Sequence, residues 1–344
     1  MVHSRAERPD RSDVILEAGC PTLIETHFPV RPVARNLLRT PLLRRHATMA
    51  RETYLLLPRL SRRPSWGVRN AMAANTGLTW KHFPAGEHGF FRAPVLISGA
   101  REAVLIDSGF TLPDGKALVE AIKASGEKLT TIYISQSDPD YYFGLMPIKA
   151  AFPEAKVIAA SATIAAIKGT VEKKLATWGP QLKENGPQAL SDIVMPEAFD
   201  SRLLALEGES IEIADAAGLA NRRYLWVPSL NAIVGGVLVF SGVHVWTADT
   251  QGAEGRAAWV KNLDAMAARK PAVVVPGHMA PSAAVDASAI RYTRDYLVAF
   301  EEEFAKTTDS AALVAAMTKR YPNAGMGVAL QIGAKVAKGE MTWG

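Results

Sequence analysis

Cysteine is nearly absent from this chain of 344 residues, which contains only Cys20. One thiol excludes a disulfide within the chain and a zinc site made of cysteines. The sequence also lacks a run of about 18 uncharged apolar residues, which argues against a membrane-spanning helix. Apolar residues still make up 48% of the chain, enough for an ordinary folded core.

Lysine is absent from residues 1–75, which contain thirteen arginines and six acidic residues and carry a net charge of +7. Residues 76–344 carry a net charge of −2. The basic character of the chain therefore belongs to its first segment. The remainder has no excess positive charge with which to bind nucleic acid, so we expect neither a nucleic-acid nor a membrane partner.

Residues 1–75 combine arginine, proline and short apolar clusters, and we expect them to be disordered. They have no apolar core next to a basic start, so they do not resemble a secretory signal, and we expect a cytoplasmic protein. A basic binding arm and a targeting segment are two interpretations. We favour a third, translated upstream sequence with the functional chain starting at Met72 or Met49, because the later residues use lysine freely.

The sequence also lacks the motifs of several enzyme classes. It has no G-x-x-x-x-G-K-[ST] loop and no G-x-G-x-x-G fingerprint, so we expect no nucleotide cofactor. It has no G-x-S-x-G elbow, and Cys20 lies outside the expected domain. No covalent nucleophile is therefore indicated.

Regular apolar patterns begin near residue 78 and predict alternating strands and helices. This alternation favours a layered α/β domain. The expected strands are residues 78–83, 89–97, 103–107, 129–135, 155–160, two within 203–214, 223–227, 232–240 and 272–276. The expected helices are residues 114–125, 146–151, 161–174 (with Ser161 as N-cap), 255–268, 283–306, 311–320 and 328–337.

One loop, I-S-Q-S-D-P-D-Y-Y-F-G-L at residues 134–145, concentrates polar residues between an expected strand and an expected helix. Such strand-end loops are where α/β proteins place functional groups. The loop resembles the T-H-x-H-x-D-H-x-x-G motif of the metallo-β-lactamase-fold superfamily. In the alignment, Gln136 takes the place of the first His, Asp138 the second His, Asp140 the Asp and Tyr141 the last His.

Four further segments resemble landmarks of this superfamily in the same order. They are A-V-L-I-D-S-G at 103–109, V-P-S-L-N-A-I-V-G-G-V-L-V-F at 227–240, G-V-H-V-W-T-A-D-T at 242–250 and V-V-P-G-H at 274–278. The third is similar to the His-x-Trp segment of one bacterial branch of the superfamily. The resemblance implies a four-layer αββα sandwich over residues 76–282. Residues 283–344 would add helices packed on this domain.

The chain departs from the superfamily pattern at most of the metal ligands. Gln136 is a poor zinc ligand, Tyr141 is a weak one, and Val237 stands where the bridging Asp is expected. No histidine occurs near residues 214–221. Only Asp138, Asp140 and His278 remain as matched metal ligands.

Two kinds of site remain open. Asp138, Asp140 and His278 with waters would suit at most one divalent ion, Zn, Mn or Fe, which would polarise a carbonyl or activate a bound water. Without a metal, Asp138 and Asp140 would serve as general bases. The resemblance implies a hydrolase of a small ester, lactone or amide, with Tyr141 or Gln136 stabilising the oxyanion. The alternative is a non-catalytic relative that binds a small ligand without metal.

Other residues are expected around this site. Asp107 follows a buried strand and would hold the site from behind. His88 would line the site. His244 and Trp246 would either pack at the end of a strand or contact the ligand. Arg222 and Arg223 are expected in solvent, unless one of them binds an anionic substrate.

Overall fold

The structure is a computed structural model and describes residues 77–343. The predictions for residues 1–75 lie outside the described residues. Within the described part, no helix combines the length and apolar character needed to cross a bilayer.

The first sheet has six strands, antiparallel from β1 to β3 and parallel from β3 to β6. In spatial order these are β1 (Thr79–His82), β2 (Val95–Ser98), β3 (Glu102–Ile106), β4 (Lys128–Tyr133), β5 (Lys156–Ala159) and β6 (Glu197–Ala198). Because β3 and β4 are parallel, the loops that follow them leave the same edge of the sheet. This edge is where the site described below is built.

The second sheet has five strands, all antiparallel except for the pairing of β10 with β12. In spatial order these are β12 (Val273–Val274), β10 (Ala232–Val234), β9 (Arg223–Val227), β8 (Glu209–Asp215) and β7 (Leu203–Leu206). A separate parallel pair joins β11 (Phe240–Ser241) to β13 (His278–Met279).

The alternation of apolar side chains along the strands explains how the sheets pack. On β3, Val104 and Ile106 belong to a buried cluster shared with Leu225 and Val234 of the second sheet. Their neighbour Leu105 belongs instead to the cluster that includes the helices. Successive residues of a strand point to opposite faces, so β3 is buried on both. Each such side chain contributes roughly 1.5–3 kcal/mol on burial.

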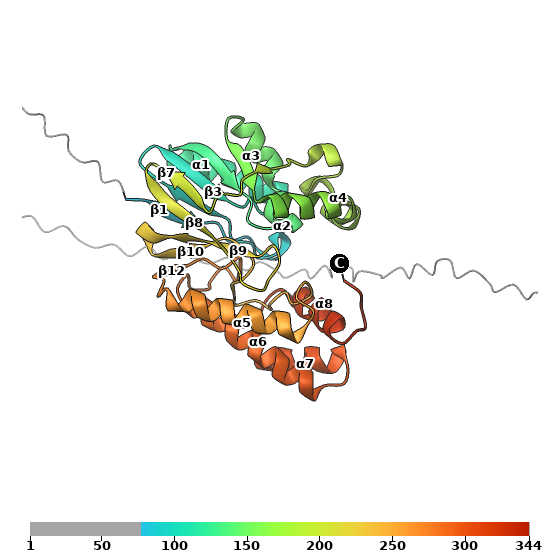
Figure 1. Cartoon of the computed structure of the whole chain (residues 1–344). Helices are drawn as coiled ribbons and strands as arrows, with labels where there is room; N and C mark the ends of the chain where they lie inside the picture. Colours follow the sequence, from blue (N-terminus) through green and yellow to red (C-terminus); the bar gives the residue numbers. More distant parts are fainter. Residues whose placement is uncertain (1–76, 344) are drawn as a thin grey trace, which may run out of the picture. The chain divides into compact units, whose positions relative to one another are not determined.

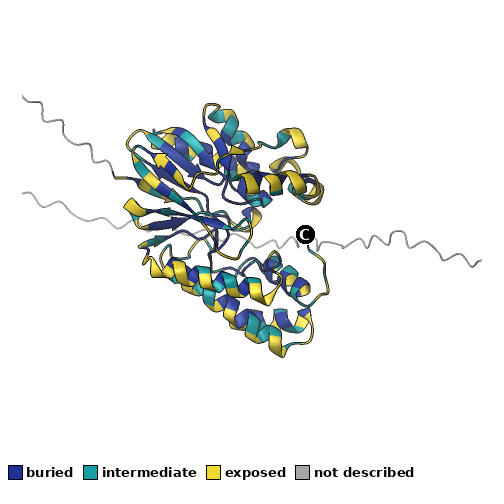
Figure 2. Ribbon diagram, viewed as in Figure 1, coloured by how far each residue is buried: buried dark blue, intermediate teal, exposed yellow. Residues whose placement is uncertain are grey.

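Helices cover the outer face of each sheet. In Figure 1, the green helices α1, α3 and α4 lie on one side of the strands, and the orange and red helices α5 to α8 lie on the other. The first group, with the short α2, is α1 (Leu112–Ser125), α2 (Pro139–Tyr142), α3 (Leu145–Ala151) and α4 (Ser161–Leu182). The second is α5 (Ala253–Ala268), α6 (Ser288–Lys306), α7 (Ser310–Arg320) and α8 (Gly327–Ala337). Figure 2 shows dark blue strands between helices with exposed outer faces.

This arrangement confirms the predicted four-layer αββα sandwich with a helical C-terminal extension. Several predicted strands are shorter than expected, and two of them have a clear local cause. Residues 89–97 form a strand only from Val95, because Phe90 and Phe91 both have a φ of 54° and Pro94 cannot donate to a sheet. Residues 232–240 are interrupted by Gly235 and Gly236, whose φ values are 68° and 74°.

The start and end of α4 also differ from the prediction. Ala160 is the N-cap, and Ser161 is the first helical residue. The side chain of Asp200 supplies the cap instead, since its Oδ1 accepts the Ser161 N–H at 2.8 Å. The helix continues past Lys174 to Leu182.

Candidate functional site

The carboxyl ends of β3 and β4 bring Asp107 and Ser135 together. Asp107 directly follows β3, and its Oδ1 accepts the Ser135 N–H at 2.8 Å. The Ser135 hydroxyl lies 2.8 Å from Asp107 Oδ2 and accepts the Gly236 N–H at 2.9 Å. Asp107 has a φ of 64°, a conformation that Asp tolerates better than most residues. Asp107 thus joins the loop that follows β3 to the loop that follows β4.

Arg92 occupies the centre of these loops, and the sequence analysis did not identify it. Its side chain is 1% exposed, and Nη2 donates to Asp107 Oδ2 at 3.0 Å. Its Nη1 donates to the carbonyl oxygen of Gly277, and its Nε donates to the carbonyl oxygen of Asp140 at 3.2 Å. Its Cζ lies 3.5 Å from the centre of the Tyr141 ring, a cation–π contact.

The charges at this centre balance one another. Burial lowers the pKa of Arg92, but Tyr141, Asp107 and Asp140 outweigh that effect and the net shift is upward. Burial raises the pKa of Asp107, while Arg92 and the hydrogen bonds from Ser135 oppose the rise. Arg92 therefore stays charged at every physiological pH.

Asp140 and His278 form a pair beside Arg92. Asp140 Oδ2 lies 3.5 Å from both His278 Nε2 and Arg92 Nε. Burial raises the pKa of Asp140 to about 7; Arg92 and Lys174 oppose the rise and Asp138 adds to it. Burial lowers the pKa of His278 to about 3, with Arg92 acting in the same direction. His278 is therefore neutral near pH 7, and its Nδ1–H donates to the carbonyl oxygen of Phe90 at 2.7 Å.

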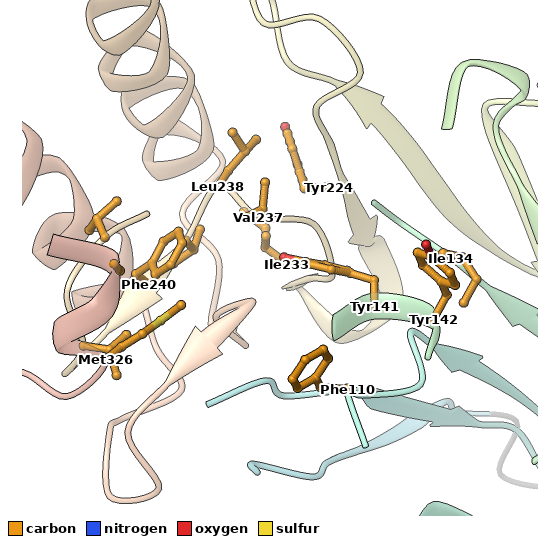
Figure 3. Packing of buried hydrophobic residues seen from close by; sticks show 14 of the residues in the cluster. Phe110, Ile134, Tyr141, Tyr142, Tyr224, Ile233, Val237, Leu238, Phe240 and Met326 are labelled. Atoms are coloured by element: carbon orange, nitrogen blue, oxygen red, sulfur yellow. The ribbon is translucent and has the colours of Figure 1, made fainter. Parts of the chain in front are cut away.

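Tyr141 is fully buried, and its hydroxyl donates to the carbonyl oxygen of Gly236 at 3.3 Å. Figure 3 shows its ring in the buried cluster with Ile233 and Val237. The expected role as an oxyanion donor needs a free hydroxyl, whereas this one is engaged. Val237, in the place of the bridging Asp of the superfamily motif, is 5% exposed and contributes only apolar contact.

These residues form the central network, which we define as Arg92, Asp107, Ser135, Asp140, Tyr141 and His278. The outer cluster lies beside it and consists of Gln136, Asp138, Lys174, Arg222 and Asp249. Together the two groups make up the strand-end site.

Asp138 is held by cations of the outer cluster. Lys174 Nζ lies 3.2 Å from Asp138 Oδ1 and donates to the carbonyl oxygen of Ser137 at 2.8 Å. Burial favours a higher pKa for Asp138, but Lys174, Arg222 and the hydrogen bond from Gln136 reverse that effect and lower it. Asp138 is thus an ionised partner of Lys174 near neutral pH.

Arg222 and Asp249 complete the outer cluster, and the sequence analysis assigned no role to Asp249. Arg222 Nη2 lies 3.5 Å from Asp249 Oδ2. Arg222 therefore forms an ion pair, whereas the sequence analysis expected it in solvent. Burial and the nearby Asp138 raise the pKa of Asp249. Asp249 Oδ1 also accepts the indole N–H of Trp343 at 2.7 Å. Arg223, expected in solvent, is 6% exposed and lies 3.5 Å from Asp215.

Three other candidates lie in different surroundings. His88 is exposed in the 3₁₀ helix Glu87–Gly89, so this loop contributes Arg92 and the Phe90 carbonyl to the site instead. His244 is buried, and its Nδ1 lies 3.0 Å from the hydroxyl of Tyr296 on α6, the packed arrangement. Trp246 packs edge-on against Trp343, with 5.3 Å between ring centres.

The residues present do not fit a metal ion. In residues 77–343, no three His, Cys, Asp or Glu side chains form a group that could hold one. Of the three predicted ligands, Asp138 is paired with Lys174, and Asp140 and His278 lie beside the Arg92 guanidinium. A divalent ion there would have to overcome the repulsion of a buried positive charge.

Two cavities occur elsewhere in the described part. One of about 250 Å³ lies near Tyr292 and Tyr321. The other, of about 260 Å³, is lined by Tyr133, Arg223 and Asp215. Neither is lined by a residue of the central network or the outer cluster.

Comparisons with known proteins yield solved structures only. No family model and no curated protein matches the sequence. A metallo-beta-lactamase from Pontibacter korlensis is 19% identical, with 65% of this chain and 96% of that chain covered and a TM-score of 0.48. The structure of VMB-1 is 18% identical, with 66% of this chain and 94% of that chain covered and a TM-score of 0.43. The structure of TMB-1 is 14% identical, with 64% of this chain and 92% of that chain covered and a TM-score of 0.39. By its own two sheets and flanking helices, the described part of the chain is a four-layer αββα sandwich.

Proposed function

We propose that the strand-end site binds a small polar molecule without a metal ion. The observation that carries this proposal is a set of buried polar atoms that lack hydrogen-bond partners among the described residues: Gln136 Oε1, Asp140 Oδ2 and Arg222 Nη1 of this site, and Tyr142 OH at the end of α2. Such atoms are rare in folded proteins and mark places where water or a ligand belongs. Three of the four belong to a single segment of seven residues.

The free atoms define the chemistry that the molecule must offer. Gln136 donates to Asp138, so its remaining Oε1 can only accept a hydrogen bond. Arg222 Nη1 can only donate one. A molecule with a carbonyl oxygen next to a hydroxyl or an N–H group satisfies both atoms. Small esters, lactones and amides with such a substituent form this class.

Hydrolysis of such a molecule is the second candidate function, and one observation favours it. Asp140 has a pKa of about 7, which suits a general base that takes a proton from water. The donor for the developing oxyanion would be Arg222 Nη1, since the hydroxyl of Tyr141 is engaged and the free atom of Gln136 is an acceptor.

A melting experiment in EDTA tests binding. Wild-type protein is mixed with a panel of p-nitrophenyl esters, γ-lactones and N-acyl amides, and its melting temperature is recorded. We expect at least one member to raise the melting temperature of the wild type and of the control Gln181→Leu, whose side chain is exposed on α4. Gln136→Leu should abolish the rise. A rise that persists in Gln136→Leu, or that requires added metal, contradicts the proposal.

Product release from the same panel separates the two candidates. If the protein is a hydrolase, Asp140→Asn should lower turnover by at least about 100-fold while the melting shift remains. If it only binds, wild-type protein will show the melting shift without product.

A further inference from the structure

The cavity of about 260 Å³ is lined by residues of both sheets. Tyr133 ends β4, Ile213 lies on β8, and Phe199 directly follows β6. Tyr133 and Ile213 belong to the buried cluster between the sheets, and Phe199 packs against it. The cavity therefore has an apolar wall and lies at the carboxyl ends of parallel strands, where α/β proteins bind ligands.

The hydroxyl group of Tyr133 is a buried polar atom in the lining of this cavity. Tyr133 is 0% exposed, and its hydroxyl has no hydrogen-bond partner among the described residues. Such an atom marks a place where water or a ligand belongs. Burial raises the pKa of this hydroxyl, so it keeps its proton at neutral pH and can donate a hydrogen bond.

Arg223 brings a second donor to the cavity. It is 6% exposed, and its Nη1 donates to Thr163 Oγ1 and to Asn221 Oδ1. Its Nε lies 3.5 Å from Asp215 Oδ1. These contacts fix the plane of the guanidinium group, while Nη2 makes no hydrogen bond to a described residue. The Arg223 charge also acts on the pKa of the Tyr133 hydroxyl, which shows that the two groups are close. A fixed guanidinium group with a free N–H is a preferred partner of a carboxylate.

The charged side chains of the lining favour an anion. They are Asp200, Arg202, Asp215 and Arg223. Asp200 is engaged by the start of α4, because its two oxygens accept the N–H and the hydroxyl of Ser161 at 2.8 and 2.6 Å. Asp215 lies 3.5 Å from both Arg202 and Arg223. At contact distance, one carboxylate thus serves two guanidinium groups, and a second anionic group would complete the set.

We propose that this cavity binds a small monocarboxylate, with its charged group against Arg223 and the Tyr133 hydroxyl and its apolar part against Phe199 and Ile213. One water needs about 10–15 Å³ of such volume, so the cavity has room for a molecule with several carbon atoms. The inference does not rest on the proposed function, because no residue of the strand-end site lines this cavity.

The test titrates the full-length chain with sodium butyrate, sodium pentanoate and sodium benzoate at constant ionic strength. Binding is followed by saturation-transfer NMR of the ligand protons and by the melting temperature. Butyramide, which resembles butyrate but carries no charge, and sodium phosphate, which has no apolar part, are the comparison ligands. We expect at least one carboxylate to bind and to raise the melting temperature, and both comparison ligands to bind more weakly.

Tyr133→Phe removes only the hydroxyl group. Because that hydroxyl has no partner in the protein, we expect the variant to melt no lower than the wild type. Its affinity for the carboxylate should fall by at least about tenfold, the usual effect of losing a hydrogen bond to a charged group. Tyr224→Phe is the matched control, since Tyr224 follows Arg223 on β9 but belongs to the other buried cluster and does not line the cavity. Its affinity should equal that of the wild type.

Ala162→Leu tests the cavity without altering a polar group. Ala162 is exposed in the first turn of α4 and lines the cavity, so a larger side chain there narrows it. We expect a folded variant with weaker carboxylate binding. Ala165→Leu is its control, because Ala165 is also exposed on α4 but lies outside the lining. If Tyr133→Phe does not fold, this pair of variants decides.

Three results would overturn the proposal. If no carboxylate binds to the wild type at tens of millimolar, water alone satisfies the Tyr133 hydroxyl. Equal carboxylate affinity in the wild type, Tyr133→Phe and Ala162→Leu would place the binding elsewhere on the molecule. Butyramide or phosphate binding as tightly as every carboxylate tested would mean that the cavity does not recognise a carboxylate with an apolar part.

Discussion

Burial shifts the pKa values of two neighbouring residues of the strand-end site, Asp140 and His278, in opposite directions. Asp140 and His278 are adjacent, yet burial raises the pKa of the acid to about 7 and lowers that of the imidazole to about 3. Both shifts favour the neutral form because burial disfavours either charge; Arg92 adds to the shift of His278 and opposes that of Asp140. The pair therefore exchanges protons with solvent at different pH values than free side chains would.

Asp140 should make stability depend on pH. An unfolded Asp releases its proton near pH 3.9, whereas folded Asp140 retains it until about pH 7. The native state thus binds more protons in this window, and its free energy of unfolding falls as pH rises. Asp140→Asn should remove this contribution, so the wild type loses up to about 1.4 kcal/mol per pH unit relative to the variant.

Urea unfolding of both proteins between pH 4 and 7 checks this prediction. His278 contributes in the opposite direction, because its lowered pKa makes stability rise with pH between about 3 and 6.5. That contribution is present in both proteins and cancels in the comparison. Parallel stability curves would show that Asp140 is ionised throughout the window.

Sequence motifs located the acidic residues of the site but not its cation. Asp107, Asp140 and His278 were identified from segments that resemble motifs of the superfamily, and the structure brings them around Arg92. Arg92 was missed because it fell inside an expected apolar strand, residues 89–97, and was assigned no role there. The usable signal was its setting, F-F-R-A-P-V-L-I, since an arginine among such residues must find buried partners.

At the scale of helices and strands, apolar periodicity predicted most elements, and the misses have local causes. The expected end of α4 was Lys174, but the helix runs to Leu182 through Gly179 and Pro180, residues that normally stop a helix. Packing of Leu175 and Trp178 against the core extends the helix through both. Propensity is a weak signal where tertiary contacts compensate.

The turn after β10 offers a prediction at this scale. Gly236 has a φ of 74°, and an added Cβ would lie 2.0 Å from the Arg223 carbonyl oxygen. Gly236→Ala should therefore cost at least about 3 kcal/mol of unfolding free energy, since the backbone of β9 cannot move away cheaply. The turn also donates to Ser135 and accepts from Tyr141, so its displacement would disturb the site.

Gly208→Ala is the matched comparison. Its φ of 89° is equally unfavourable for alanine, but no described atom lies within 4 Å of the added Cβ. We expect a loss of only about 1–2 kcal/mol. Equal losses for the two variants in urea unfolding would show that the close approach at Gly236 has no effect on stability.

At the scale of the whole molecule, the sandwich could be predicted because its motifs follow one another in a fixed order. The chemistry of the site could not, because it depends on which segment supplies the central charge. The layers place the loop before β2 against the ends of β3 and β4, and this brings Arg92 to Asp107 and Asp140. Local sequence patterns do not predict this contact between segments that are distant in the chain.

The central claim is that a guanidinium group, and no metal ion, holds the centre of this site. Crystals grown with zinc chloride and measured at the zinc absorption edge test it most directly. We predict no anomalous peak among Asp107, Asp140 and His278, with density for Arg92 in contact with both carboxylates. A zinc peak about 2 Å from Asp140 and His278, with Arg92 displaced, would contradict the account.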